Sequence, residues 1–239
     1  MPPPRKDNKL TVKPAFTLAE ILITLGIIGI VAALTLPTLI ANHQKKVTVT
    51  KLKKAYSLAS QVIENDEISV WDWDNWDNAE TILREHFVPK LQVAQVYPPK
   101  SSYKAMCDKQ YIWLGGIGIN SPFINSTASV RLNDGTCLGL NPKDNSQWEG
   151  GYNYNFFIDI NGPQNPNIAG IDLFIFYINK NGQLRPFGDT FTDEKLNGTA
   201  TDSCNYDKQA TRTFGGYSCA AKIIRDGWEI KKDYPWRVK

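Results

Sequence analysis

The sequence is poor in the residues from which catalytic and metal sites are usually built. It has two histidines, His43 and His86, and its four cysteines form neither a CxxC pair nor a Cys/His spacing that would bind zinc. No Ser/His/Asp or Cys/His constellation can be recognised. We therefore expect no enzyme, no metal and no cofactor, and a structural or binding role is favoured over catalysis.

Charge is missing from one long segment. From Ile21 to Asn42 no residue is charged, a run of 22 residues, and a helix needs about 20 apolar residues to cross a bilayer. Over the whole chain, 42% hydrophobic and 21% charged residues are ordinary for a folded protein, which excludes a wholly disordered chain and a polytopic membrane protein. The length of 239 residues allows one domain with an appendage. We expect a single membrane span joined to one folded domain.

The body of the chain has no excess of basic charge. The net charge is +3, and residues 1–15 supply it with four basic residues and one acidic residue. The remainder is balanced, so the bulk charge gives no support for nucleic-acid binding. Flanking charges also leave the orientation of the span open, because the lysines beyond it match or exceed the basic residues before it. These are Lys45, Lys46, Lys51, Lys53 and Lys54.

Helical spacing of apolar residues continues past the charge-free run. Residues 16–64 are predicted to form one long helix, apolar in its first half and amphipathic in its second. Pro37 lies inside this helix and predicts a kink, because proline lacks a backbone donor and clashes with the preceding turn. Asp77 followed by Glu80 resembles a capping box that opens a second helix ending before Pro89.

Beyond residue 110 the pattern changes from helical to β. Apolar or alternating runs are candidate strands at 111–119, 128–132, 137–140, 155–160, 172–178 and 183–187. Asp134-Gly135 and Asn181-Gly182 are hairpin signals. The segment 219–230 is expected to contain a short helix that ends near Gly227. We expect an α+β fold in which the amphipathic half of the long helix packs against an antiparallel sheet of four or five strands.

The order of segments at the amino end resembles a particular leader type. An ordinary secretory signal is cut after its apolar core, whereas here the plausible small-residue cut precedes that core. The segment resembles the class III leader of type IV prepilins and type II secretion pseudopilins. The matching residues are Ala15 before the cut, Phe16 after it, Thr17, Leu18, Glu20 four residues beyond Phe16, and Pro37 twenty-one residues beyond Phe16. Most family members have glycine before the cut, so Ala15 departs from the pattern.

The resemblance implies how the chain is processed and divided. In that family a membrane prepilin peptidase cuts before the phenylalanine and methylates the new amino terminus, which here is Phe16. Residues 1–15 would be the leader peptide, 16–42 the transmembrane and filament-core helix, and 43–239 a type IV pilin-like α+β domain outside the cytoplasm. The implied fold has the long helix packed on the sheet and a disulfide-stapled C-terminal region.

The resemblance also implies a function and partners. The chain would be a structural subunit of a type IV pilus or a type II secretion pseudopilus, with a minor pilin or pseudopilin favoured. Its partners would be other pilin or pseudopilin subunits, the prepilin peptidase/methyltransferase, the inner membrane and the pilus or secretion assembly machinery. It would cross the inner membrane once and then enter a periplasmic or cell-surface filament.

Glu20 has two interpretations. Locally, Thr17-Leu18-Ala19-Glu20 is a capping box, and a carboxylate in the first turn favours the helix dipole. A carboxylate at the centre of a membrane helix costs about 2.5 to 3.5 kcal/mol, so Glu20 must lie near an interface or find a positive partner. The resemblance implies that it pairs with the freed amine of Phe16 on a neighbouring subunit. We expect both roles.

A membrane-anchored extracytoplasmic binding module that does not polymerise is the alternative function. It would keep Met1–Ala15 or lose them by generic proteolysis. A cluster of acidic and aromatic residues is a candidate ligand-binding surface for such a module. Alternatively, its tryptophans simply pack over the sheet. The cluster comprises Trp71, Asp72, Trp73, Asp74, Trp76 and Asp77.

Asp159, Asn161 and Asp172 surround a turn with oxygen ligands of the kind that calcium uses. Their spacing is not that of an EF-hand, so a structural turn is favoured over a calcium site.

All four cysteines follow the apolar run, which favours two disulfides in an oxidising compartment over four reduced buried thiols. Four cysteines allow three connectivities. We prefer Cys107 with Cys137 and Cys204 with Cys219, because each pair closes a short loop. The resemblance supports the second pair, since many pilins have a C-terminal disulfide loop.

Overall fold

The computed structural model describes residues 16–65, 79–99, 106–116, 118–119, 127–142, 154–179, 181–198, 202–205 and 215–236. By the density of internal contacts the chain divides into two units, Met1–His43 and Gln44–Lys239. The predicted leader, including Ala15, and the Trp/Asp cluster of residues 71–77 lie outside the described residues.

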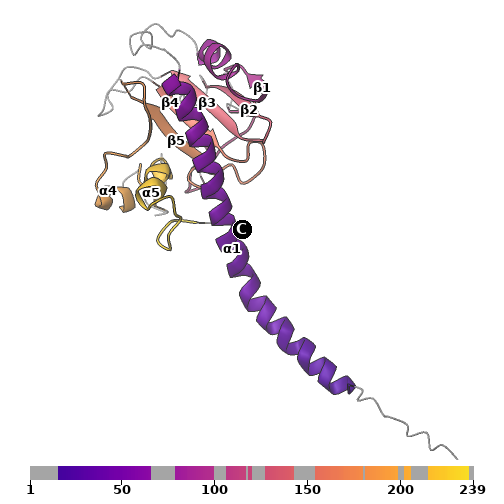
Figure 1. The fold of residues 1–239 in the computed structure, drawn as a ribbon. Coiled ribbons are helices and arrows are strands. Elements are labelled where there is room, and N and C mark those ends of the chain that lie inside the picture. Colours follow the sequence, from indigo (N-terminus) through magenta and orange to yellow (C-terminus); the bar gives the residue numbers. More distant parts are fainter. Residues whose placement is uncertain are drawn as a thin grey trace, which may run out of the picture. The chain divides into compact units, whose positions relative to one another are not determined.

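Helix α1 (Leu18–Asn65) is the longest element and belongs to both units (Figure 1). Its bounds agree with the predicted helix to within two residues at each end. The helix continues without interruption through Pro37. A proline has no N–H, so the carbonyl of Ala33 lacks its usual helical donor there.

Six strands form one antiparallel sheet, and each strand pairs with its neighbour in sequence (Figure 1). The strands are β1 (Val93–Tyr97), β2 (Ala128–Leu132), β3 (Cys137–Pro142), β4 (Tyr154–Asp159), β5 (Leu173–Ile178) and β6 (Leu184–Pro186). The prediction of four or five strands was therefore too low. Strand β1 was missed because it lies at the sheet edge, where none of its residues is buried and its pattern alternates only weakly.

The two hairpin signals mark turns. Gly135 has φ +90° between β2 and β3, and Gly182 has φ +71° between β5 and β6. Both values lie in the left-handed region that glycine adopts without strain. Asp134 Oδ1 accepts a hydrogen bond from Thr136 N–H at 3.0 Å and closes the first turn. The turn chemistry thus set the register of both hairpins.

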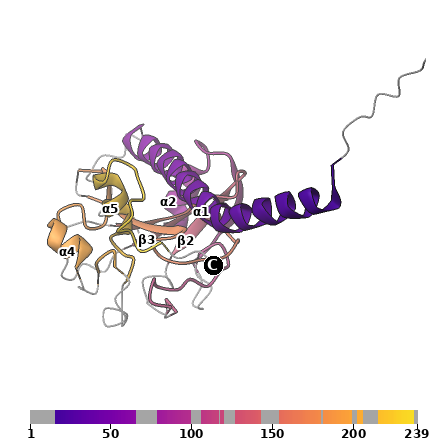
Figure 2. The same ribbon diagram turned by 90° about the horizontal axis from the view of Figure 1, so that it is seen from below.

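Side chains on the first face of the sheet form one core with helical residues. Alternate strand residues such as Val130, Phe156 and Phe176 contact this core together with Leu52 and Ala59 of α1. In Figure 2 the second half of α1 crosses the sheet on the same side as α2 (Ala79–Ile82) and α5 (Cys219–Arg225), which also contribute to this core. The predicted packing of the amphipathic half on the sheet is present within the second unit.

The second face of the sheet is also covered, although by loop segments. Phe157 and Ile175 from the sheet pack there against Met106, Trp113 and Tyr217. Covering both faces explains why β4 and β5 are buried at every position. A half-exposed sheet would instead alternate apolar and polar residues.

The strand predicted at 111–119 was wrong. Ile112 makes only isolated bridges, to Gly118 and to Ile168, and Gly116 turns the chain with φ +87°. Backbone hydrogen bonds tie this segment to other loops, as in Leu114 N–H to the Gly215 carbonyl at 3.0 Å. Its apolar side chains therefore pack on the second face without entering the sheet.

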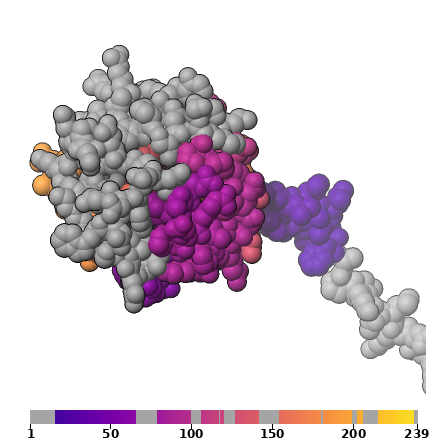
Figure 3. All heavy atoms as spheres, turned by 90° about the horizontal axis from the view of Figure 1, so that it is seen from above, coloured from indigo at the N-terminus to yellow at the C-terminus, as the bar shows by residue number. Residues whose placement is uncertain are grey.

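The predicted second helix is present in a different form. A short α2 continues directly into a π-helical turn, η2 (Leu83–Phe87), and the helix ends at Val88 before Pro89. Asp77 of the predicted capping box lies outside the described residues. Figure 3 shows the end of α1 and the α2–η2 segment side by side on one face, where Val62 and Ile82 share the core. The helix α4 (Asp193–Asn197), capped by Thr192, was not predicted.

Two disulfides join Cys107 to Cys137 and Cys204 to Cys219. These are the pairs preferred from the sequence. The first holds the loop layer to β3, and the second holds the 202–205 segment to the start of α5. Disulfides are typical of proteins that fold in oxidising compartments.

Candidate functional site

The amino end of α1 is closed by a reciprocal cap. Thr17 N–H donates to Glu20 Oε2 at 2.8 Å, and Glu20 N–H donates to Thr17 Oγ1 at 3.2 Å. The Thr17 hydroxyl also donates to Glu20 Oε2 at 2.9 Å. Two backbone N–H groups that a helix start leaves unpaired are thus satisfied. The local interpretation of Glu20 as a capping residue is confirmed.

The first half of α1 presents apolar side chains on all sides. Together with Phe16 just before it, its large hydrophobic residues are from 43% to 83% exposed: Leu18, Ile21, Leu22, Ile23, Leu25, Ile27, Ile28, Ile30, Val31, Leu34, Leu36, Leu39 and Ile40. By length and hydropathy this helix can cross a membrane. An apolar surface of this extent is not stable in water, so lipid or other protein must cover it.

Two threonine hydroxyls inside the apolar half form hydrogen bonds within the helix. The Thr24 hydroxyl donates to the carbonyls of Glu20 and Ile21, both at 2.9 Å. The Thr35 hydroxyl donates to the Val31 carbonyl at 2.9 Å. Such bonds let hydroxyls enter an apolar medium at low cost. Glu20 is the only charged residue between Phe16 and Asn42.

The second half of α1 belongs to the folded domain. Tyr56 stacks on Phe176 with ring centroids 5.4 Å apart, and its hydroxyl donates to the Leu184 carbonyl at 3.1 Å. At the first hairpin, Lys54 Nζ lies 2.7 Å from Asp134 Oδ2. These contacts fix the second half of α1 across several strands of the sheet.

The calcium candidates Asp159 and Asp172 do come close together, on the second face. Asp159 is completely buried, and its Oδ2 accepts the Tyr111 hydroxyl at 2.6 Å. Its Oδ1 accepts the N–H groups of Asn161 at 3.0 Å and Gly162 at 2.8 Å. Burial raises the pKa of Asp159 to about 7.

The carboxylate of Asp172 also accepts hydrogen bonds from backbone N–H groups. Its Oδ2 accepts Asn167 N–H at 2.7 Å and its Oδ1 accepts Ile168 N–H at 2.6 Å. Burial raises its pKa as well. Every oxygen of the two carboxylates thus accepts a hydrogen bond, and a cation would have to displace those donors. Among the described residues no group of three His, Cys, Asp or Glu is arranged to hold a metal.

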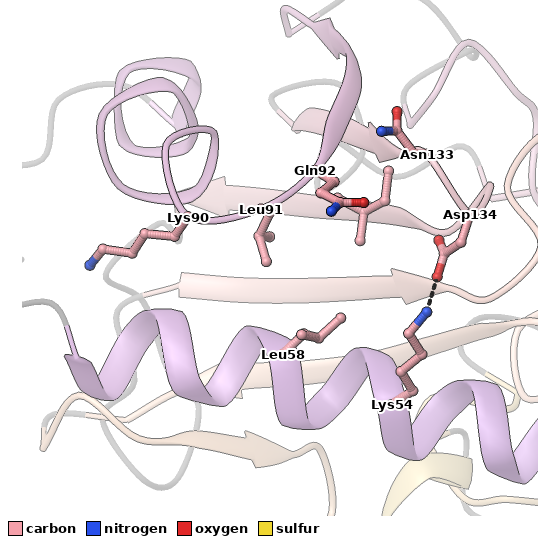
Figure 4. A pocket seen from close by; sticks show the side chains of 8 residues that line it. Lys54, Leu58, Lys90, Leu91, Gln92, Asn133 and Asp134 are labelled. Carbon is pink, nitrogen blue, oxygen red and sulfur yellow. Dashed lines mark hydrogen bonds and ion pairs between the residues drawn. The ribbon is translucent and has the colours of Figure 1, made fainter.

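A pocket of about 340 Å³ lies where α1, the segment after η2 and the first hairpin meet. Figure 4 shows Leu58 and Leu91 between the ribbons and the Lys54–Asp134 ion pair at one end. Asn133 N–H donates to the Gln92 carbonyl at 2.9 Å and closes the edge. The volume of this pocket is at the lower limit for small-ligand sites. The sequence offered no signal for this pocket, because its walls come from three separate segments.

These features define a class of protein: an α+β domain with an antiparallel sheet, whose core helix is continuous with an apolar segment long enough to cross a bilayer. Residues 38–238 match the model of DUF6613, a family of unknown function, and because this match spans most of the chain the protein belongs to that family. No curated protein and no solved structure matches the chain.

The family match begins one residue after Pro37 and extends through the sheet to the C-terminal region. It therefore includes the amphipathic half of α1 and both disulfides. Phe16, Glu20 and Pro37 lie before it. The family description assigns no activity, so any function must be argued from the residues themselves.

Proposed function

We propose that this chain is a structural subunit of the type IV pilus or type II secretion pseudopilus class, with a minor pilin or pseudopilin favoured. It is cut between Ala15 and Phe16 by a prepilin peptidase, which methylates Phe16. It is held in the inner membrane by the first half of α1 and is then assembled through that half into a filament outside the cytoplasm.

The observation that carries this proposal is the continuity of α1. The same helix is exposed and apolar in its first half, and in its second half it supplies Leu52, Ala55 and Ala59 to the core of the domain. A signal removed after its apolar core does not need this continuity. An apolar half that stays attached to its domain does need this continuity. When the apolar halves of several copies pack against one another, their domains are then brought together.

Glu20 supports the intermolecular step. Its Oε2 is already held by Thr17, yet it is the only acidic or basic side chain in residues 16–42. Removal of the leader would create an ammonium group at Phe16. Pairing that group with Glu20 of a neighbouring copy would satisfy both charges inside an apolar filament core.

Processing can be tested by intact mass measurement of the chain expressed in bacteria together with a prepilin peptidase. The expected product begins at N-methylated Phe16. Ala15→Gly should be cut at least as well as the natural chain, because glycine is the usual residue there. Ala15→Glu should remain uncut, because a small residue is needed at the cut. A mature chain that retains Met1–Ala15 would refute the proposal and favour the non-polymerising binding module.

Assembly can be tested with Glu20→Gln, because an amide oxygen can still accept the Thr17 hydrogen bonds but carries no charge. We expect this variant to be cut and inserted but excluded from filaments sheared from cells. Glu64→Gln, at an exposed position at the far end of α1, is the matched control and should assemble normally. Normal assembly of Glu20→Gln would show that capping is the whole role of Glu20.

A further inference from the structure

All the lysines of α1 lie in one stretch, residues 43–54, which we term the basic segment. It follows the charge-free run directly and contains Lys45, Lys46, Lys51, Lys53 and Lys54. Between residues 21 and 63 the helix has no acidic residue. The positive charge of the basic segment is therefore not neutralised along its own helix.

The lysines of the basic segment differ in their partners. Lys54 pairs with Asp134 at 2.7 Å, and Lys53 Nζ lies 5.7 Å from the centre of the Trp228 ring. No ion pair joins Lys45, Lys46 or Lys51 to any other residue that the structure describes. Lys46 and Lys51 are exposed and Lys45 is half-buried. Within the described part of the chain, these three ammonium groups therefore have no anionic partner.

The distance of Lys45 and Lys46 from the span matches the headgroup layer of a bilayer, whereas Lys51 lies about 13 Å beyond Asn42, outside that layer. A helix rises about 1.5 Å per residue, so Lys45 and Lys46 lie about 5 to 6 Å beyond Asn42. The headgroup layer extends roughly 5 to 7 Å beyond the hydrocarbon on each side. Lysine side chains also reach along the helix to place their ammonium groups at this depth.

The directions of the lysines favour lipid over a protein partner. Successive residues of a helix are about 100° apart, so Lys45 and Lys46 point in different directions at the depth of the headgroups. Lipid headgroups surround a helix on every side where it leaves the bilayer.

We infer that the basic segment binds the phosphate groups of anionic phospholipids in the bilayer that α1 crosses. The inference depends on the span and not on polymerisation. It therefore stands or falls separately from processing at Phe16 and from filament assembly. Its consequence is an enrichment of anionic lipid around each copy of the chain.

The test uses the full chain reconstituted into phosphatidylcholine bilayers with a trace of spin-labelled phosphatidylglycerol or spin-labelled phosphatidylcholine. Electron paramagnetic resonance reports the fraction of each label that is immobilised at the protein. One lysine near a charged membrane surface changes the affinity about fivefold. We expect a preference for phosphatidylglycerol of about fivefold or more, which weakens at high salt because surface charges are screened.

The double variant Lys45→Gln/Lys46→Gln should reduce this preference to near one. Lys109→Gln/Lys232→Gln removes the same charge outside α1 and should retain the natural preference. Tryptophan fluorescence checks that both variants are folded. Equal immobilisation of the two labels by the natural chain would overturn the inference, as would an unchanged preference in the first variant. Displacement of the label by soluble glycerol phosphate at matched ionic strength would assign the site to a free phosphate compound and would also overturn it.

Discussion

The two halves of α1 share one backbone geometry and yet meet different surroundings. In the first half Leu34 is 74% exposed, whereas in the second half Leu52 and Ala59 are completely buried. The difference lies in the arrangement of apolar residues around the axis. They cover every side of the first half, but they form a stripe at positions 52, 55, 59, 62 and 63 in the second.

This contrast separates two sources of stability. A helix that is apolar on all sides needs an apolar medium, and a helix with one apolar stripe needs one packing surface. The sheet is the surface for the second half. Changes in the second half should therefore alter the folding of the domain, and changes in the first half should alter insertion and assembly.

The largest expected effect is on the domain. Leu52→Ala should lower the free energy of unfolding by about 2 to 5 kcal/mol, because it leaves a cavity in a closed core. Leu34→Ala, the same change in the first half, should alter it by less than about 0.5 kcal/mol. Denaturant titration of the full chain in detergent micelles, followed by tryptophan fluorescence, measures both. Equal losses would mean that the halves are not energetically distinct.

A charge in the first half should act on insertion. Ile28→Asp places a carboxylate in the charge-free run and should cost about 3 kcal/mol of membrane insertion. Gln44→Asp, beyond the run, should cost much less. The fraction of chain that resists alkaline extraction from membranes reports the effect. The unfolding midpoint of the domain should be the same in both variants, and a lowered midpoint in Ile28→Asp alone would contradict the separation.

The domain should also respond to pH through its second face. The pKa of Asp159 is about 7 in the folded chain, against 3.8 as the ordinary value. Between these values the folded state binds more protons, so the free energy of unfolding falls as pH rises. Asp172 adds a shift of the same sign. From pH 5 to pH 7 we expect a loss of about 2 kcal/mol.

Asp159→Asn should remove much of this pH dependence, because an amide resembles the protonated acid and can keep the bonds from Asn161 and Gly162. Asp193→Asn, at an exposed acid outside this cluster, should leave the dependence intact. Denaturant titrations at pH 5, 6 and 7 measure the slopes. A natural chain that becomes more stable over this range would disprove the assignment.

The smallest effect concerns the ion pair between α1 and the first hairpin. The side chains of Lys54 and Asp134 are 59% and 38% exposed, so water and salt screen them. Lys54→Gln should lower the free energy of unfolding by less than about 1 kcal/mol. Lys46→Gln, a lysine without a described partner, should change it even less. A loss above 2 kcal/mol in Lys54→Gln would show that the pair matters more than its exposure indicates.

Much of the fold was predictable where the signal is local. The bounds of α1, the two glycine turns and the strands β2 to β5 follow from spacing and turn residues within short windows. The Thr17–Glu20 cap is a four-residue pattern and was predicted for the same reason. Helix α4 had a comparable signal in Thr192, which begins a Thr-Asp-Glu-Lys segment, but a helix of five residues is too short for periodicity to reveal.

Other features were not predictable. The segment at 111–119 is as apolar as a strand, but its neighbours are Asn167 and Gly215, which no local pattern indicates. The Tyr111–Asp159 bond joins residues 48 positions apart. Both belong to the loop layer on the second face of the sheet.

Composition and periodicity alone establish a continuous helix, its uncharged first half, its single amphipathic stripe and the hairpins that follow, because each depends on residues less than a few turns apart. The loop layer that buries Asp159, strand β1 at the sheet edge and the pocket beside Lys54 arise only when the chain has closed on itself. Their contacts join residues far apart in sequence, and the free energy of such contacts depends on burial that no short segment possesses.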